Sequence, residues 1–103
     1  MPSTEYDAVR FILDAPQIAH RTRPYVSGDD FDFAGLVRET EAMSGGEALL
    51  VRVAHELWQA DKQAGLWEIV RRTDPTNFQR ILWELAIARG LIAIDDVEQR
   101  LAA

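Results

Sequence analysis

The chain has 103 residues, a length that accommodates one hydrophobic core, so we predict a single helical domain over residues 1–103. With 48% hydrophobic and 27% charged residues, its composition is that of a folded globular protein and argues against wholesale disorder. The absence of cysteine excludes disulfide bonds and thiolate chemistry, and a net charge of −6 with one lysine disfavours binding to nucleic-acid phosphates.

The sequence also predicts where the protein is found. No stretch approaches the roughly 18 to 20 apolar residues needed to cross a bilayer. The first ten residues lack the basic start and apolar stretch of a secretory signal. We therefore expect a soluble, cytoplasmic protein that does not enter membranes.

The first half of the chain contains one clear helix followed by an irregular stretch. The helix is predicted to begin near Thr4, whose hydroxyl is placed to cap it, and to end before Pro16. Its apolar face contains Tyr6, Val9, Ile12 and Leu13. Residues 16–30 break the helical pattern and predict a loop, in which Tyr25 and Val26 suit a short extended piece.

A second helix is predicted to open at Asp29 or Asp30, because either carboxylate can accept hydrogen bonds from first-turn amides. Apolar residues at helical spacing continue it until Gly45 and Gly46. The aspartates of this segment lack the distal glutamate of a calcium loop, so we assign them to helix capping.

The third helix has the clearest start. Ser44 and Glu47 match a capping box, and we expect the helix to run from Gly45 to about Ala64 with Gly65 as its C-cap. Its apolar side chains span an arc of roughly 200°. Because an arc that wide needs neighbours on two sides, we expect this helix to be the centre of the bundle.

The remainder of the chain is also helical. Residues 66–72 suit a short amphipathic helix, and Asp74 and Gly90 delimit a long C-terminal helix. Residues 91–94 suit an extended arm before Asp95 caps a last short helix. The prediction is an all-α fold, a small bundle of about four to five helices around a central helix, with an irregular N-terminal loop.

The residues that carry chemistry form no recognisable catalytic or metal-binding pattern. His55 and Glu56 begin the zinc-protease motif His-Glu-x-x-His, but Gln59 stands where the second histidine is required. The serines have no histidine and acid in a recognisable arrangement. We therefore predict that the protein is not an enzyme and has no metal site and no cofactor.

The strongest functional lead is a pair of apolar stripes on the long C-terminal helix. One stripe is predicted to face the core and contains Phe78, Ile81, Leu82, Leu85, Ala86 and Ala88. Trp83 and Ile87 lie one turn apart on the other side. Either the first helix or the C-terminal segment covers this second stripe, or it forms a protein interface together with Arg80, Trp67 and Trp58. We predict a non-enzymatic protein–protein interaction or self-association module of unknown pathway, with a homodimer as one form.

An alternative function rests on three arginines. Arg71, Arg72 and Arg80 flank the turn at Thr73, in the outline of a helix-turn-helix. They make a small helical nucleic-acid-binding regulator the second hypothesis. The following helix, however, offers Gln79, Arg80 and Glu84 rather than a basic face to read DNA. We therefore expect a protein partner rather than a nucleic acid.

Overall fold

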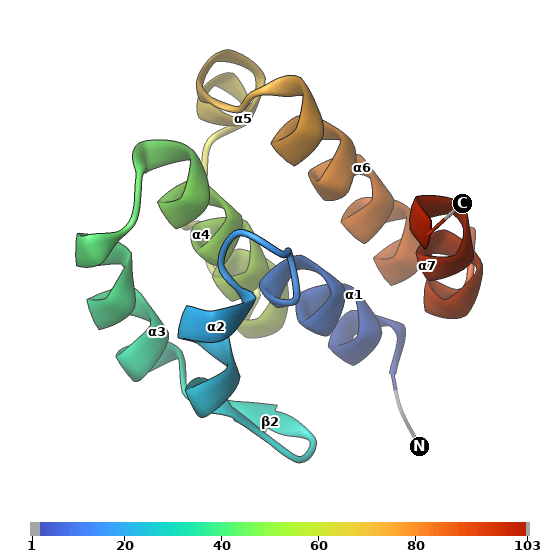
Figure 1. The fold of residues 1–103 in the computed structure, drawn as a ribbon, viewed down its shortest axis with the longest axis horizontal. Helices are drawn as coiled ribbons and strands as arrows, with labels where there is room; N and C mark the ends of the chain where they lie inside the picture. Colours follow the sequence, from blue (N-terminus) through green and yellow to red (C-terminus); the bar gives the residue numbers. More distant parts are fainter. Residues whose placement is uncertain (1–2, 103) are drawn as a thin grey trace.

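A computed structural model describes residues 3–102 and confirms the all-α class (Figure 1). No helix in this range is both long and apolar enough to span a membrane. The elements follow in the order α1 (Thr4–Leu13), α2 (Ala19–Thr22), the 3₁₀ helix η1 (Arg23–Tyr25), β1 (Val26–Ser27), β2 (Asp30–Phe31), α3 (Phe33–Glu39), the 3₁₀ helix η2 (Thr40–Ala42), α4 (Gly45–Gln59), α5 (Leu66–Arg72), α6 (Pro75–Arg89) and α7 (Ile94–Ala102).

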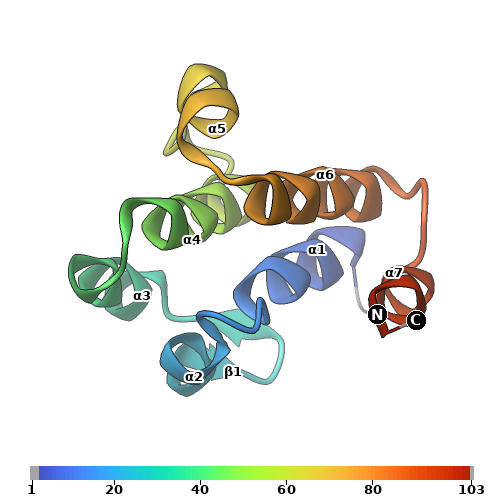
Figure 2. The ribbon, with the colours of Figure 1, turned by 45° about the horizontal axis from the view of Figure 1, so that its top comes forward.

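Helix α1 occupies the middle of the bundle. It packs against both α4 and α6, while α5 stands on the opposite face of the α4–α6 pair (Figures 1 and 2). Half of its residues are buried: Ala8, Val9, Phe11, Ile12 and Leu13. The sequence predicted α4 as the centre. Helix α4 does contact α1, α3, α5 and α6. However, α1 is the helix that packs most extensively against both α4 and α6, so it occupies the middle of the bundle.

The core consists of two apolar clusters that α1 joins. The larger cluster packs Ile12 and Leu13 of α1 against buried residues of α3 and α4. The smaller cluster packs Phe11 of α1 against Ile87 of α6 and Val97 of α7. Because α1 contributes to both clusters, it connects α3 and α4 with the C-terminal helices α6 and α7.

The first helix starts as predicted but has a different cap. The hydroxyl of Ser3 accepts a hydrogen bond from the Tyr6 amide at 2.9 Å, so Ser3 is the N-cap. Thr4 is the first residue of the helix, and its hydroxyl donates to the Ala88 carbonyl at 3.0 Å. The threonine therefore ties the start of α1 to the end of α6.

The predicted loop over residues 16–30 is more ordered than its composition indicated. It contains α2, η1 and a two-stranded antiparallel hairpin in which Val26 pairs with Phe31. Thr22 is buried and donates its hydroxyl to the Leu13 carbonyl at 2.7 Å, which fixes α2 against the end of α1. The following helix opens later than predicted, because Asp32 rather than Asp29 or Asp30 accepts from its first-turn amides.

The capping box of Ser44 and Glu47 is confirmed, but α4 ends five residues early. Ala60 adopts a left-handed conformation with φ 57°, and the chain then turns back along the helix. Gly65 has φ −91° and is the N-cap of α5 rather than the C-cap of α4.

Both predicted ends of α6 are confirmed. Asp74 is the N-cap, Pro75 takes the first turn, and Gly90 is the left-handed C-cap with φ 81°. The predicted arm between α6 and α7 is shorter than expected and forms no strand, since α7 already begins at Ile94.

Core packing gives the first prediction. Leu50 on α4 is fully buried, so replacing it by alanine removes packed apolar volume and leaves a cavity. We expect Leu50→Ala to lower the free energy of unfolding by about 2–5 kcal/mol in a urea titration followed by circular dichroism. Leu91→Ala is the matched control, because Leu91 is 78% exposed, and we expect a change of about 0.5 kcal/mol or less. Equal losses in the two variants would contradict this account of the core.

Candidate interaction surface

Helix α6 turns a partly polar face to the core. Its buried residues include Asn77 and Glu84 as well as Ile81 and Ile87. Two leucines of the stripe predicted to face the core, Leu82 and Leu85, are instead 45% and 48% exposed. The prediction was therefore wrong for these two leucines, because α6 is rotated about its axis relative to the expected packing, whereas Ile81 of the same stripe is buried as predicted.

The second stripe is the one that the fold covers. Ile87 is buried in the smaller cluster, and Trp83 packs against that cluster from its edge. Helices α1 and α7 supply the cover through Phe11 and Val97. Of the two interpretations left open by the sequence, internal cover is observed for Ile87, whereas Trp83 is half-buried.

A different apolar surface is exposed. Three of its residues lie on α5, where Leu66, Trp67 and Val70 are all exposed, Leu66 by 81%. Leu85 of α6 lines a cavity together with Leu66, and Leu82 is exposed on the same helix. We call these five residues the α5–α6 face. Exposed apolar side chains that gather in one region, rather than singly, mark interaction sites.

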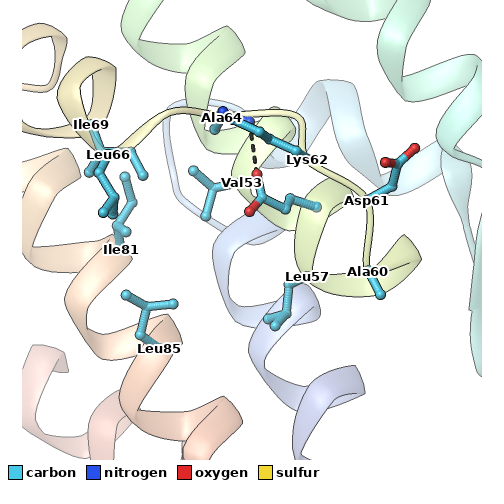
Figure 3. A pocket seen from close by; sticks show the side chains of 11 residues that line it. Val53, Leu57, Ala60, Asp61, Lys62, Ala64, Leu66, Ile69, Ile81 and Leu85 are labelled. Atoms are coloured by element: carbon cyan, nitrogen blue, oxygen red, sulfur yellow. Dashed lines mark hydrogen bonds between the residues drawn. The ribbon is translucent and has the colours of Figure 1, made fainter.

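A cavity of about 380 Å³ opens within this surface, between α4, α5 and α6 (Figure 3). Val53 and Leu57 line it from α4, Ile81 and Leu85 from α6, and Leu66 from α5. Val53 and Ile81 are buried and form the floor, whereas the leucines of α5 and α6 are exposed at the rim. The surface is therefore concave in its middle and mostly apolar, with Glu56, Asp61 and Lys62 as the charged residues of the cavity lining.

Polar side chains of α4 hold α5 in place. The Arg52 guanidinium makes two hydrogen bonds of 3.0 Å to the Glu68 carboxylate and one of 2.9 Å to the Gln63 carbonyl. One turn further along α4, the Glu56 carboxylate accepts from the amides of Gln63 and Ala64 at 2.9 Å, the second of which Figure 3 draws. Helix α5 has no fully buried residue, so these bonds fix its position together with the packing of the half-buried Ile69 against the larger cluster.

These contacts also change ionisation. The Ala64 and Gln63 amides lower the pKa of Glu56, because both bonds favour the charged carboxylate. The bidentate bond from Arg52 lowers the pKa of Glu68 in the same way. Both carboxylates are therefore ionised in the folded protein at neutral pH, and their bonds are at full strength there.

Glu84 has the opposite character. It is 0% exposed, and neither of its carboxylate oxygens has a hydrogen-bond partner among the described residues. Burial raises the pKa of this carboxyl well above its ordinary value, because the charged form is not solvated. The sequence pattern did not predict that Glu84 is buried, because its position on the helix is equally compatible with a solvent-exposed side chain.

The remaining residues singled out by the sequence do not gather into one site. Trp58 belongs to an aromatic cluster with Phe31, their ring centroids 4.9 Å apart, so it is not part of the α5–α6 face. Of these residues, only Trp67 lies on that face. Arg71 and Arg72 are exposed on α5, whereas Arg80 turns toward α1 and donates to the Phe11 carbonyl.

The described residues offer no group of three or more metal-binding side chains. His55 stacks on Phe33 at 4.7 Å between ring centroids, and its buried Nδ1 has no hydrogen-bond partner within residues 3–102. His55 is therefore a packed aromatic side chain of α4.

No protein-family model matches the chain, and neither a curated protein nor a solved structure was found to be similar to it.

Glu84 gives a prediction with a definite pH dependence. Because the pKa of Glu84 is raised in the folded state, the folded protein binds the carboxyl proton more tightly than the unfolded chain does. Stability is therefore lost as the pH rises above about 4.3, the pKa of a glutamate in the unfolded chain. We expect Glu84→Gln to raise the free energy of unfolding at pH 8 by about 1–3 kcal/mol, and the gain to vanish near pH 4.

The measurement is urea unfolding at several pH values. The control is Glu41→Gln, since Glu41 is exposed on η2 and should change stability little at either pH. A Glu84→Gln protein that is less stable than the original at pH 8 would show that the buried carboxylate has a favourable partner.

Proposed function

We propose that this protein is a non-enzymatic interaction module that self-associates, with the α5–α6 face of one copy packed on the same face of a second copy. The observation that carries this proposal is the gathering of exposed apolar residues around a concave cavity. Burying one leucine or valine side chain fully stabilises an assembly by about 1.5–3 kcal/mol before ordering costs are counted. Covering several of them at once favours association.

The shape of the surface supports a second copy as the occupant. Helix α5 projects from the α4–α6 layer (Figure 2) and carries Leu66, Trp67 and Val70. Leu66 also lines the cavity between α4, α5 and α6. In a two-fold interface the same surface of both copies meets, with each residue of one copy against its counterpart's neighbour on the other, so a projection beside a hollow favours such pairing. The α5–α6 face contains both.

The charges around this surface support the same occupant. Exposed residues of both signs border it, Asp61 and Lys62 on one side and Arg71 and Arg72 on α5. Residues 51–103 hold eight acidic and seven basic residues, whereas residues 1–50 hold nine and four. The acidic excess therefore belongs to the other half of the chain, and two copies can meet here without strong repulsion.

The test is the molar mass in solution, measured by light scattering over a range of concentrations. We expect a mass that rises toward that of two chains with concentration. Leu85→Glu places a charge at the rim of the cavity and should return the protein to a single chain. Trp67→Ala should weaken association with little effect on folding, because Trp67 is exposed.

Leu91→Glu is the matched control, since Leu91 is an exposed leucine that lies in the turn after α6, away from the cavity. It should leave the mass of the assembly unchanged. A protein that remains a single chain at every concentration would overturn self-association, and an assembly that Leu85→Glu does not affect would place the interface elsewhere.

A further inference from the structure

A second cavity, of about 640 Å³, lies on another side of α6. Successive helical residues are about 100° apart around the helix axis, which places Trp83 and Gln79 on a different side of α6 from Leu85 of the α5–α6 face. Pro16, Leu101 and Arg80 also line this cavity, so the turn after α1 and the end of α7 border it. We call it the Arg80–Trp83 pocket. Its volume is within the range of small-molecule sites.

Arg80 is held rigidly at this pocket. Its Nε and Nη2 donate to the Phe11 carbonyl at 3.2 and 2.8 Å, and its guanidinium lies 4.1 Å from the centre of the Phe11 ring. These contacts satisfy a carbonyl at the end of α1 that has no helical partner. They use two of the five N–H donors of the side chain, so the group is oriented while three donors remain.

The charge of Arg80 is not neutralised within residues 3–102. No carboxylate lies within 4.0 Å of it in this range, since the ion pairs found join Arg10 to Asp14, Arg21 to Glu39 and Arg52 to Glu68. Burial lowers the pKa of Arg80, and the more distant Asp14 and Glu98 offset this only in part. A half-buried cation without a close counter-ion is incompletely stabilised, and a bound anion would stabilise it.

The rest of the pocket is suited to an apolar body. Trp83 lies about one turn from Arg80 along the helix and lines the same cavity. Pro16 and Pro75 add rigid apolar walls, and the guanidinium of Arg100 lies 6.0 Å from the Trp83 ring. One oriented cation, an aromatic wall and an apolar rim together match a ligand with an acidic group attached to a flat or branched apolar part.

We propose that the Arg80–Trp83 pocket binds a small carboxylic acid with an apolar body. The carboxylate accepts from the donors of Arg80 that the fold leaves unused, and the apolar body packs on Trp83 and the prolines. This site is independent of the self-association surface, so either one can fail without the other.

The test uses N-acetyl-phenylalanine as the probe and its neutral amide as the matched control. The indole N–H signals of Trp58, Trp67 and Trp83 are followed by NMR, with Trp83→Phe identifying the third. We expect the acid to shift the Trp83 signal saturably at millimolar concentration while the other two stay in place. The amide should bind about tenfold more weakly or worse, because it forms no charge-assisted hydrogen bond.

Variants separate Arg80 from the other cations. Arg80→Gln should abolish the difference between acid and amide, whereas Arg71→Gln, on exposed α5, should preserve it. Because Arg80→Gln also removes the bonds to Phe11 and can unfold the protein, the comparison of the two probes on the unaltered chain decides the question. Equal affinities for acid and amide, or no saturable shift of Trp83, would overturn the proposal.

Discussion

The two hydrogen bonds from Arg80 to the Phe11 carbonyl fix the rotation of α6 on α1, and both candidate surfaces depend on that rotation. With Arg80 turned to α1, Glu84 one turn later points into the same interface and is buried. Leu82 and Leu85 are then carried to the outside. The same rotation brings Trp83 to the edge of the smaller core cluster, where it lines the second cavity.

This rotation of α6 lowers the folding stability of a single chain. An unpartnered carboxyl lies in the core while exposed leucines lie outside, which reverses the usual placement of the two residue types. Ile81 and Ile87 offset part of the cost by burial, and the Asn77 amide oxygen accepts from Gln17. Covering the α5–α6 face with a second copy would bury the exposed leucines without moving α6, which is why association and this orientation suit each other.

Local signals in the sequence predicted the start of α4 and both ends of α6, whereas the caps of α1 and α3, the end of α4 and the buried side of α6 were predicted wrongly. The capping box at Ser44 and the ends of α6 are correct because cap residues act on their own first or last turn. The apolar pattern of α6 has two stripes, and nothing in the pattern tells which stripe meets α1. Likewise the early end of α4 depends on Glu56 bonding to the loop that follows, a contact that periodicity does not encode.

Lowering the pH has opposite effects on the stability of the core and on the hydrogen bonds that hold α5. The pKa values of Glu56 and Glu68 are lower in the folded protein than in the unfolded chain, where a glutamate has a pKa of about 4.3. Their hydrogen bonds therefore stabilise the fold fully above about pH 4.3, and this stabilisation is lost as the pH falls through the lower pKa values of the folded protein. The raised pKa of Glu84 means that packing of α6 on α1 is most favourable below that same unfolded value. Acid therefore loosens α5, which polar bonds hold, while it favours the α1–α6 contact. Since α5 carries three of the five residues of the α5–α6 face, the self-association that we propose should weaken at a higher pH than the one at which acid destabilises the core.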